Sequence, residues 1–328
     1  NIAIKNDDIL IAKLLLNHPN INVNLKTIFV NSLNDCLNYE ETTALNLAIM
    51  NENIELVKLL LKYPNIEVNP EPNEGFDGDT PLNAAIKKNN IEIINLLLQM
   101  PNININARSI YTDSEKSALI TAIENNNAKV VELLMQNPKL DVNSEIKFNK
   151  PYSRIKRRFR RFGLVNQKGA LFMAVEQENV EIVKLLLNNS NINVNSNFLY
   201  NDDEYIKETA LNMALKKKNI EIIKLLLGMP NIDVNLKSIH NKNEETALNY
   251  ALKNNDALTV KLLLNNPKID VNLGSIFKDE NGNEEEERAL IIAIKNKNNE
   301  IIDLLLKKPN NDVNVVSRRN KEIEAALN

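Results

Sequence analysis

The residues with the most obvious capacity for chemistry lie in one basic segment. Between Lys150 and Lys168 the sequence has eight basic residues and no acidic residue. Guanidinium and ammonium groups attract carboxylates and phosphates, and phenylalanines between them could anchor a partner by apolar contact. Three interpretations stay open: a solvated insertion, a contact with an acidic protein or peptide, and a site for nucleic acid or nuclear import. The candidate binding residues are Arg154, Lys156, Arg157, Arg158, Phe159, Arg160, Arg161 and Phe162.

The other reactive residue types form no catalytic or metal-binding pattern. His18 and His240 belong to no HExxH motif and have no neighbouring cysteine, so nothing supports a zinc site. Cys36, the one cysteine, excludes an internal disulfide and is expected in a connecting loop. Seven glycines in 328 residues make neither a GxGxxG nor a GxxxxGK[ST] motif. We therefore predict no catalytic residue, no cofactor and no metal, and no enzyme activity.

Charge and hydropathy give the whole chain no mark of nucleic-acid binding or of membrane insertion. The chain has 40 basic and 43 acidic residues, and its net charge of −3 does not mark it as a nucleic-acid or membrane binder. The longest clean apolar stretch, residues 289–294, is far too short to span a membrane. The acidic segments at residues 202–204 and 279–287 lack the ligand spacing of a calcium loop, so they are interpreted as solvated loops.

One repeated pattern builds the chain and must position these segments. A leucine triplet recurs at seven places, and an eighth copy ends in methionine. From the second copy onward, an Ala-Leu or Pro-Leu pair lies fifteen residues before the triplet. Because only the connection between repeats varies in length, the sequence predicts a rigid unit with elastic loops on one side. Ten residues after each triplet begins comes an asparagine: Asn24, Asn69, Asn106, Asn143, Asn195, Asn235, Asn272 and Asn314.

The segment from Thr80 to Asn106 shows what one unit forms. Apolar residues at helical spacing predict a short helix from about Thr80, and Asn89 and Asn90 interrupt it and start a second helix. Pro101 ends that helix, and residues 103–106 alternate like a short extended segment. Two short helices cannot bury their apolar faces alone, so the units must stack. The eight asparagines are expected to tie loop backbones together between repeats.

These residues resemble the ankyrin repeat. The segments TPLNAAIKKNNIEIINLLLQMPNININ, ETALNLAIMNENIELVKLLLKYPNIEVN and ETALNMALKKKNIEIIKLLLGMPNIDVN follow the family pattern TPLHxAxxxGHxxIVxxLLxxGAxVN through the second helix. The resemblance implies an all-α repeat fold, an ankyrin-type helix-turn-helix-loop solenoid with short extended finger loops. Two departures matter. Asn replaces the family's His in four repeats, and Glu, Lys or Asn replaces the Gly before the second helix, so we expect a reshaped turn.

The offsets also predict the domain organisation, a single ankyrin-repeat array over residues 1–328. A partial first repeat spans 1–24, a basic insertion loop spans 144–168, and a ninth repeat opens at 325–328. Since neither end carries a polar capping face, we expect a fragment truncated at both ends. The shortest period is 37 residues. The seven repeat cores are 43–69, 80–106, 117–143, 169–195, 209–235, 246–272 and 288–314.

The family resemblance implies the function. Ankyrin arrays bind proteins through finger loops and a concave face, so we expect a non-catalytic, monomeric scaffold for protein partners, with no membrane insertion. The alternative is that the array is a regulatory or targeting arm of a larger enzyme, such as a kinase or ubiquitin ligase. The enzyme itself would then lie outside this chain. The expected location is intracellular, in the cytoplasm, and the basic cluster leaves a nuclear location as an alternative.

Overall fold

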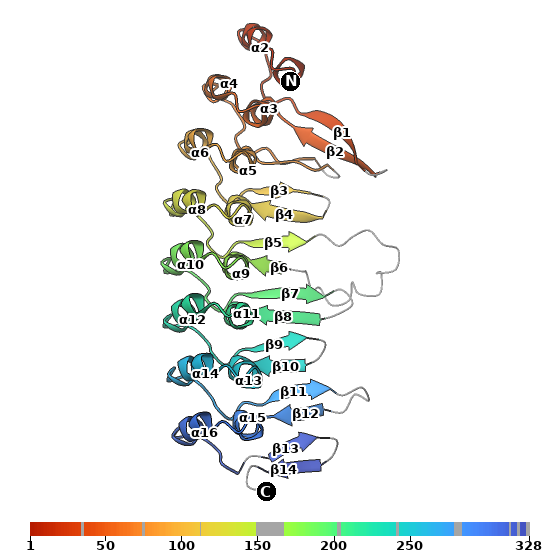
Figure 1. The fold of residues 1–328 in the computed structure, drawn as a ribbon. Coiled ribbons are helices and arrows are strands. Elements are labelled where there is room, and N and C mark those ends of the chain that lie inside the picture. Colours follow the sequence, from red (N-terminus) through yellow and green to blue (C-terminus); the bar gives the residue numbers. More distant parts are fainter. Residues whose placement is uncertain are drawn as a thin grey trace. The chain divides into compact units, whose positions relative to one another are not determined.

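The computed structural model describes residues 1–33, 36–73, 76–111, 113–148, 167–201, 205–240, 243–278, 284–314, 316–319 and 322–325. The chain divides into two compact units, Asn1–Gly163 and Leu164–Asn328. Each unit is a stack of repeats in which a first helix, a tight turn, a second helix and an extended hairpin follow one another (Figure 1).

The first unit contains four helix pairs and five strands within its described residues. Strands β3, β4 and β5 form one antiparallel sheet, and β1 and β2 form a separate two-stranded hairpin. The helices are α1 (Ile2–Lys5), α2 (Ile9–Leu16), α3 (Ala44–Met50), α4 (Ile54–Leu60), α5 (Pro81–Lys87), α6 (Ile91–Leu98), α7 (Ala118–Glu124) and α8 (Ala128–Met135). The strands are β1 (Thr27–Leu33), β2 (Cys36–Thr42), β3 (Arg108–Ile110), β4 (Ser114–Ser117) and β5 (Glu145–Phe148).

The second unit also contains four described helix pairs, and its strands form one antiparallel sheet from β6 to β14 in chain order. The helices are α9 (Ala170–Glu176), α10 (Val180–Leu187), α11 (Ala210–Lys217), α12 (Ile220–Leu227), α13 (Ala247–Lys253), α14 (Ala257–Leu264), α15 (Ala289–Lys295) and α16 (Asn299–Leu306). The strands are β6 (Gln167–Gly169), β7 (Asn197–Asn201), β8 (Tyr205–Thr209), β9 (Lys237–His240), β10 (Asn243–Thr246), β11 (Ser275–Lys278), β12 (Glu284–Glu287), β13 (Val316–Arg319) and β14 (Glu322–Ala325).

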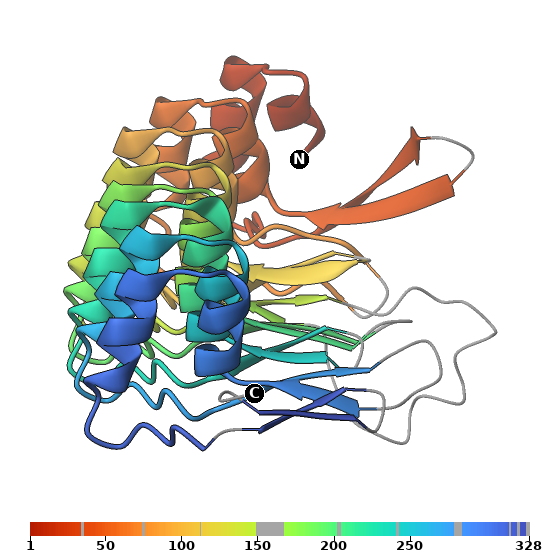
Figure 2. The same ribbon diagram turned by 60° about the horizontal axis from the view of Figure 1, so that its bottom comes forward.

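Three layers are visible in the second unit. The first helices of its repeats, α9, α11, α13 and α15, form a row beside the hairpins, and the second helices form a row farther away (Figure 1). The hairpins all project to the same side of the helices (Figure 2). The core lies between successive helix pairs, where residues such as Ile222 and Leu226 of α12 are fully buried. Burying each such side chain contributes about 1.5–3 kcal/mol to stability. A single helix pair would leave these side chains exposed, because the neighbouring repeats bury them.

Short polar residues fix where the helices begin. In each described repeat, the second helix follows an Asn or Asp whose side chain accepts a hydrogen bond from the backbone N–H three residues later. Asn90, for example, accepts from Ile93 at 3.1 Å. Most first helices are capped in the same way by Thr or Ser, for example Thr80 at the start of α5. Each cap satisfies a donor that the helix leaves unpaired, which is worth about 1 kcal/mol.

The turn between the two helices is not reshaped, so that expectation was wrong. The residue at the family's glycine position keeps a left-handed backbone in all eight described turns, with φ between 52° and 59°. The packing of the two helices and the cap that follows fix the backbone geometry of the turn. Residues other than glycine therefore adopt the same left-handed conformation. The residues are Asp7, Glu52, Asn89, Asn126, Glu178, Lys218, Asn255 and Lys297.

Replacing Lys218 with Gly is expected to stabilise the second unit. Lys218 has φ 56°, a conformation that costs a residue with a Cβ roughly 1–2 kcal/mol. Glycine loses part of that gain through its more flexible unfolded chain, so the net increase in unfolding free energy should be about 0.5–1 kcal/mol. Urea titration followed by circular dichroism measures it. The control Lys217→Gly, inside α11, should lower stability by a similar amount; a lower midpoint for Lys218→Gly would contradict the prediction.

The Val-Asn asparagines join successive repeats, as predicted. Six of these asparagines make the same two hydrogen bonds, and we call each such pair of bonds a rung. The side-chain amide donates to a carbonyl of the next repeat, and the side-chain oxygen accepts the backbone N–H of the residue two positions after that carbonyl. Asn235, for example, donates to the carbonyl of Lys268 at 2.8 Å and accepts from the N–H of Asp270 at 2.9 Å. The other five rungs start at Asn24, Asn69, Asn106, Asn195 and Asn272.

The connections form more regular structure than the short extended fingers we expected. Most become antiparallel hairpins, and residues 103–106, expected to be extended, precede the strand β3 instead of forming it. Cys36 lies at the start of β2, paired in register with Leu33, and so belongs to a hairpin strand. Neighbouring fingers keep one register: the residue four after the Val-Asn asparagine pairs with the residue three before a first helix, as Ile239 does with Lys207 and Ile276 with Glu244.

Among the described residues, every helix is too short or too polar to cross a membrane.

Candidate functional site

The fingers are fastened to the helices by a buried asparagine and a serine. Asn249, in the first turn of α13, donates through Nδ2 to Ser275 Oγ at 3.1 Å and to the carbonyls of Leu273 and Glu287. The serine lies 26 residues after the asparagine. The same pair recurs with the same spacing as Asn83 with Ser109 at 2.6 Å and Asn212 with Ser238 at 2.7 Å. The family's His is thus replaced by an amide that holds the start of each hairpin against the start of its helix.

This attachment brings three side chains together where the first helix meets the hairpin. They are a carboxylate two residues before the helix, a lysine six residues after the helix begins, and a ring five residues after the Val-Asn asparagine. We call each set a corner cluster. The three corner clusters in the described residues are Asp79, Lys87 and Tyr111; Glu208, Lys216 and His240; and Glu245, Lys253 and Phe277.

The corner cluster of the first unit is fully connected. Lys87 Nζ lies 2.9 Å from Asp79 Oδ2 and 2.6 Å from the Tyr111 hydroxyl, and that hydroxyl donates to Asp79. Burial, reinforced by the negative charge of Asp79, raises the pKa of Tyr111 far above its ordinary value. The Lys87 ammonium also lies 4.5 Å from the centre of the Tyr111 ring. The phenol therefore stays protonated and works as a donor and a contact surface, not as a base.

The Glu208 corner cluster encloses a buried carboxylate. Glu208 is almost completely buried, and Lys216 and Ser238 both donate to it. The Nε2 atom of His240 lies 2.8 Å from Glu208 Oε2 and 3.0 Å from Lys216 Nζ. The side chains of His240 and Lys216 remain partly exposed. The buried charge thus fixes the orientation of two exposed groups.

The third corner cluster continues into the next repeat. Lys253 Nζ lies 3.2 Å from the centre of the Phe277 ring, 3.6 Å from Glu245 and 3.1 Å from Glu287. Glu287 also pairs with Lys295 at 3.2 Å, which is the same carboxylate-to-lysine spacing one repeat later. The reversed pairs Lys116 with Glu124 and Lys168 with Glu176 occupy the same positions in α7 and α9. A row of ion pairs with rings beside them therefore follows this corner within each unit.

Glu245 and Glu287 are expected to respond in opposite directions to neutralisation. Burial raises the pKa of Glu245 more than Lys253 lowers it. For Glu287, burial is the largest single influence and acts upward, but Lys253 and Lys295 together lower its pKa. Glu245→Gln should therefore raise the unfolding free energy at pH 7, and Glu287→Gln should reduce it by up to about 1 kcal/mol.

The pH dependence gives the check on this pair. A raised pKa means that Glu245 contributes stability only below its unfolded pKa near 4 and loses it as the pH rises. A lowered pKa means that Glu287 contributes above pH 4 and loses it on acidification. Urea titrations of both variants at pH 7 and pH 3 should show two differences from the parent chain of opposite sign at pH 7, both shrinking at pH 3. Equal signs at pH 7 would contradict the assignment.

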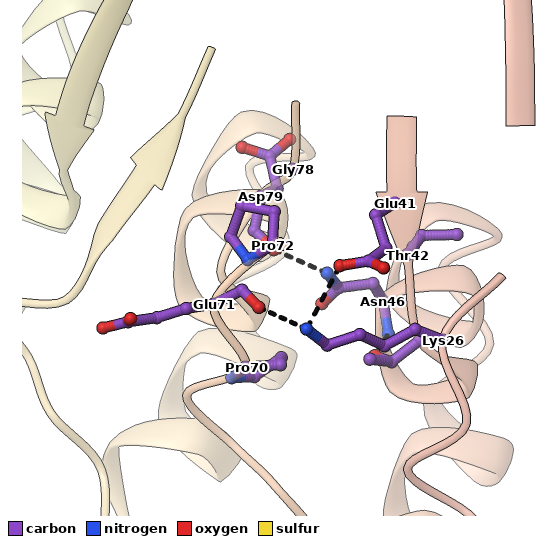
Figure 3. A pocket seen from close by; sticks show the side chains of 10 residues that line it. Lys26, Glu41, Thr42, Asn46, Pro70, Glu71, Pro72, Gly78 and Asp79 are labelled. Carbon is purple, nitrogen blue, oxygen red and sulfur yellow. Dashed lines mark hydrogen bonds and ion pairs between the residues drawn. The ribbon is translucent and has the colours of Figure 1, made fainter. Parts of the chain in front are cut away.

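A small polar recess in the first unit belongs to the frame and not to a ligand site. Glu41 is buried and accepts the backbone N–H of Asn73 at 2.7 Å, its side-chain amide at 2.8 Å and the Lys26 ammonium at 3.1 Å. Lys26 also donates to the carbonyl of Glu71, and Asn46 donates to that of Asp79 at 2.6 Å (Figure 3). The remaining space fits about one water molecule. The buried carboxylate therefore holds the connection at residues 70–73 in place.

None of the described residues forms a group of three or more His, Cys, Asp and Glu side chains placed to hold a metal ion. His240 does have a carboxylate neighbour, but a lysine shares that carboxylate, which makes the group a structural ion cluster. His18 lies just after α2, and its Nδ1 accepts the backbone N–H of Asn20 at 3.3 Å. The candidate residues Arg154, Lys156, Arg157, Arg158, Phe159, Arg160, Arg161 and Phe162 all lie outside the described residues.

The family model described as ankyrin repeats in three copies matches residues 1–109, 71–146, 155–238 and 236–317, which together cover most of the chain.

The chain belongs to the ankyrin-repeat family.

Several solved ankyrin structures are similar to this chain. The ankyrin repeat domain of Bcl-3, from the IkappaB family, is 18% identical, with a TM-score of 0.51 over 80% of this chain and 97% of that one. The ankyrin repeat protein EF0377 is 23% identical, with a TM-score of 0.49 over 67% and 96%. An ankyrin repeat domain from Acinetobacter baumannii has the same identity and TM-score, over 67% and 95%. No curated protein matches the chain. The predicted ankyrin-type solenoid is confirmed.

Sequence reasoning missed the corner clusters, although the ankyrin array carries a signal for them. In four connections a three-residue pattern begins three residues after the Val-Asn asparagine. It consists of Ser or Thr, then Ile, then an aromatic residue or His. In six repeats the residue two before the first helix and the residue six after its first residue carry opposite charges. The four ring segments are Thr27–Phe29, Ser109–Tyr111, Ser238–His240 and Ser275–Phe277.

Proposed function

We propose that the chain is a non-catalytic scaffold for protein binding, and that partners bind along the row of corner clusters. The observation that carries the proposal is the recurrence of a partly exposed ring beside a lysine and a carboxylate at one corner of the repeats. Aromatic side chains are enriched in the centres of protein interfaces, and charged groups around them set the orientation of the partner. Because each cluster is fixed by the repeat, binding orders few additional side chains.

The spacing of the rings suggests how a partner runs. His240 lies in β9 and Phe277 lies in β11, two strands apart in one sheet. Two strand spacings amount to roughly 10 Å, which equals about three residues of an extended chain. An extended segment that crosses the strands would therefore span the distance between two neighbouring rings with about three residues. Apolar side chains suit the rings, and the lysine and carboxylate beside each ring can pair with charged side chains of either sign.

The test compares two faces of the same folded chain. A finger-face variant carries His240→Ala and Phe277→Ala. A matched control carries Lys184→Ala and Glu221→Ala, an exposed ion pair on the second helices, far from the hairpins (Figure 1). Both variants are used as bait for affinity capture after circular dichroism has shown equal helix content. We expect partners captured by the parent chain to be lost from the finger-face variant by tenfold or more and kept by the control. Retention by both would contradict the proposal.

We propose in addition that the basic segment at residues 154–162 contributes to partner binding. Its support is the sequence alone, eight basic residues without an acidic one between Lys150 and Lys168. A variant with Gln at Arg157, Arg158, Arg160 and Arg161 should lose affinity for an acidic protein partner, with a salt dependence that shrinks in the variant. An affinity that these four changes leave intact would remove the segment from the interface.

A further inference from the structure

The two charges of each corner ion pair are not equally accessible. One charge lies on the strand, two residues before the first helix, and the other lies six residues after the helix begins. In all six such pairs among the described residues, the side chain on the helix is the more exposed of the two. A partner that approaches from solvent therefore meets the charge on the helix first. The helix-side residues are Lys87, Glu124, Glu176, Lys216, Lys253 and Lys295.

The strand-side charge is less exposed because the next finger covers it. Glu208 is the extreme case, with a side chain 2% exposed against 32% for Lys216. Ser238 and His240, both from β9, lie within hydrogen-bonding distance of its carboxylate. A cationic side chain of a partner has little access to a carboxylate in this position, whereas an anionic side chain can approach the lysine.

The exposed charge has the same sign in three successive repeats of the second unit. It is negative at Glu176 in α9 and positive at Lys216 in α11, Lys253 in α13 and Lys295 in α15. In this row, α11 packs against α13, and α13 packs against α15. Because packed helices lie about 8–10 Å apart, the three lysines recur at roughly that spacing. We call these three residues the lysine row.

The lysine row has a neutral donor beside it. Tyr250 lies three residues before Lys253, on the same side of α13, and is partly exposed. Burial, followed by the charges of Glu245 and Glu208, raises the pKa of Tyr250 above its ordinary value. Its hydroxyl therefore stays protonated at neutral pH and can donate to a carboxylate.

We propose that the segment which binds the corner clusters of the second unit is an acidic segment of a partner protein, and that its carboxylates contact the lysine row. The inference rests on the proposed function and adds the charge of the partner to it. A polyproline-II segment has three residues per turn and rises about 3.1 Å per residue, so side chains three positions apart lie on one side, roughly 9 Å from each other. Acidic residues at every third position thus match the spacing of the lysines.

Nucleic acid is a less suitable anion for this surface. Lys253 and Lys295 already lie 3.1 and 3.2 Å from Glu287, so a phosphate backbone would release few counterions from them. The net charge of −3 also gives the whole chain no general attraction for a polyanion. A protein segment needs only a few carboxylates and can add apolar contacts with Phe277.

The experiment measures how peptides of different charge bind to the full chain. The probe is a fluorescein-labelled peptide with Glu at every third position and Pro and Leu between them, and two matched peptides have Gln or Lys in place of Glu. The chain carries Gln at Arg157, Arg158, Arg160 and Arg161, so that the basic segment does not contribute. Fluorescence polarisation should show the Glu peptide binding about tenfold more tightly than the Gln peptide, and the Lys peptide binding least.

A reversed variant tests the orientation of the ion pairs without changing the net charge. It carries Glu245→Lys, Lys253→Glu, Glu287→Lys and Lys295→Glu. Every ion pair among these four positions keeps two opposite charges, in the orientation that α7 and α9 already use. The reversed variant should bind the Glu peptide about tenfold more weakly than the parent chain and bind the Lys peptide more tightly.

A milder variant keeps the test valid if circular dichroism shows that the reversed variant is unfolded. Lys253→Gln with Lys295→Gln should weaken binding of the Glu peptide by about fivefold or more. The matched control Lys184→Gln with Lys261→Gln removes two exposed lysines from the second helices and should bind the Glu peptide like the parent chain.

Three results would overturn the inference. They are a Glu peptide that binds no more tightly than the Gln peptide, lysine-row variants that keep the affinity of the parent chain, and a thymidine oligonucleotide that binds more tightly than the Glu peptide. Affinity capture separates this failure from that of the proposed function. If His240→Ala with Phe277→Ala loses the captured partners and the reversed variant keeps them, only the acidic charge of the partner is wrong. If both keep them, the proposed function fails as well.

Discussion

Replacing Lys216 with Met is expected to lower the unfolding free energy by about 3 kcal/mol. Methionine keeps the length of the side chain and removes its charge. Glu208 is almost completely buried and accepts from Lys216, so the change leaves a desolvated carboxylate whose remaining partners within the described part of the chain are Ser238 and His240. An unpaired buried charge costs far more than a surface ion pair contributes. Urea titration of the parent chain and the variant at pH 7 measures the loss.

The control is another lysine with a carboxylate at hydrogen-bonding distance. Lys184 lies 2.7 Å from Glu221, but both side chains are exposed. Lys184→Met should cost less than about 1 kcal/mol, because water solvates the remaining carboxylate. If the two methionine variants lose equal stability, the burial of Glu208 is not what matters.

A double variant separates the loss of the pair from the loss of the lysine. Glu208→Gln with Lys216→Met removes both charges and leaves an amide that can still bond Ser238. We expect it to regain at least half of the stability that Lys216→Met loses, because removal of both partners leaves no buried charge. A double variant less stable than Lys216→Met alone would contradict this account.

The repeat and its helices could be predicted from the sequence because their causes are local. The leucine triplets, the Asn and Asp caps and the proline stops all act within one helix or one turn. The Val-Asn rungs were also predictable, since eight copies at one offset point to a shared role. The left-handed turn was misjudged because residue preference was weighed against a geometry that packing had already fixed. At Lys218 and Glu178 the two packed helices override that preference.

The hairpins and the corner clusters were harder to predict because they join residues that are distant in sequence. Ser275 matters only because Asn249, 26 residues earlier, is buried beside it. Lys253 meets Phe277 and Glu287 only once the strand register is known. A hydrophobic pattern cannot supply that register for strands such as Glu284–Glu287, which has no apolar residue.

Replacing Asn249 with Ala is expected to lower the unfolding free energy of the second unit by about 3 kcal/mol. Asn249 is fully buried, and its amide serves Ser275 and the carbonyls of Leu273 and Glu287 at 3.1–3.2 Å. Without it these acceptors lose a donor in a place that water reaches poorly, and the start of the β11–β12 hairpin loses its attachment to α13. Urea titration followed by circular dichroism measures the loss, and Asn254→Ala, an exposed asparagine in the same repeat, should stay within about 0.5 kcal/mol.

Two further substitutions decide whether the donor or the filled volume is responsible. The array itself has Ile at this position in Ile120 and Ile291, and the Asn249 side-chain oxygen has no hydrogen-bond partner. If volume decided stability, Asn249→Ile would stabilise the chain by removing that unpaired oxygen. We expect a loss of about 2 kcal/mol instead, because three acceptors each lose one donor where a single acceptor is removed. Asn249→His, which restores the family's residue and keeps an N–H donor, should be the best tolerated of the three. An Ile variant more stable than the His variant would show that the amide fills space and does not fasten the finger.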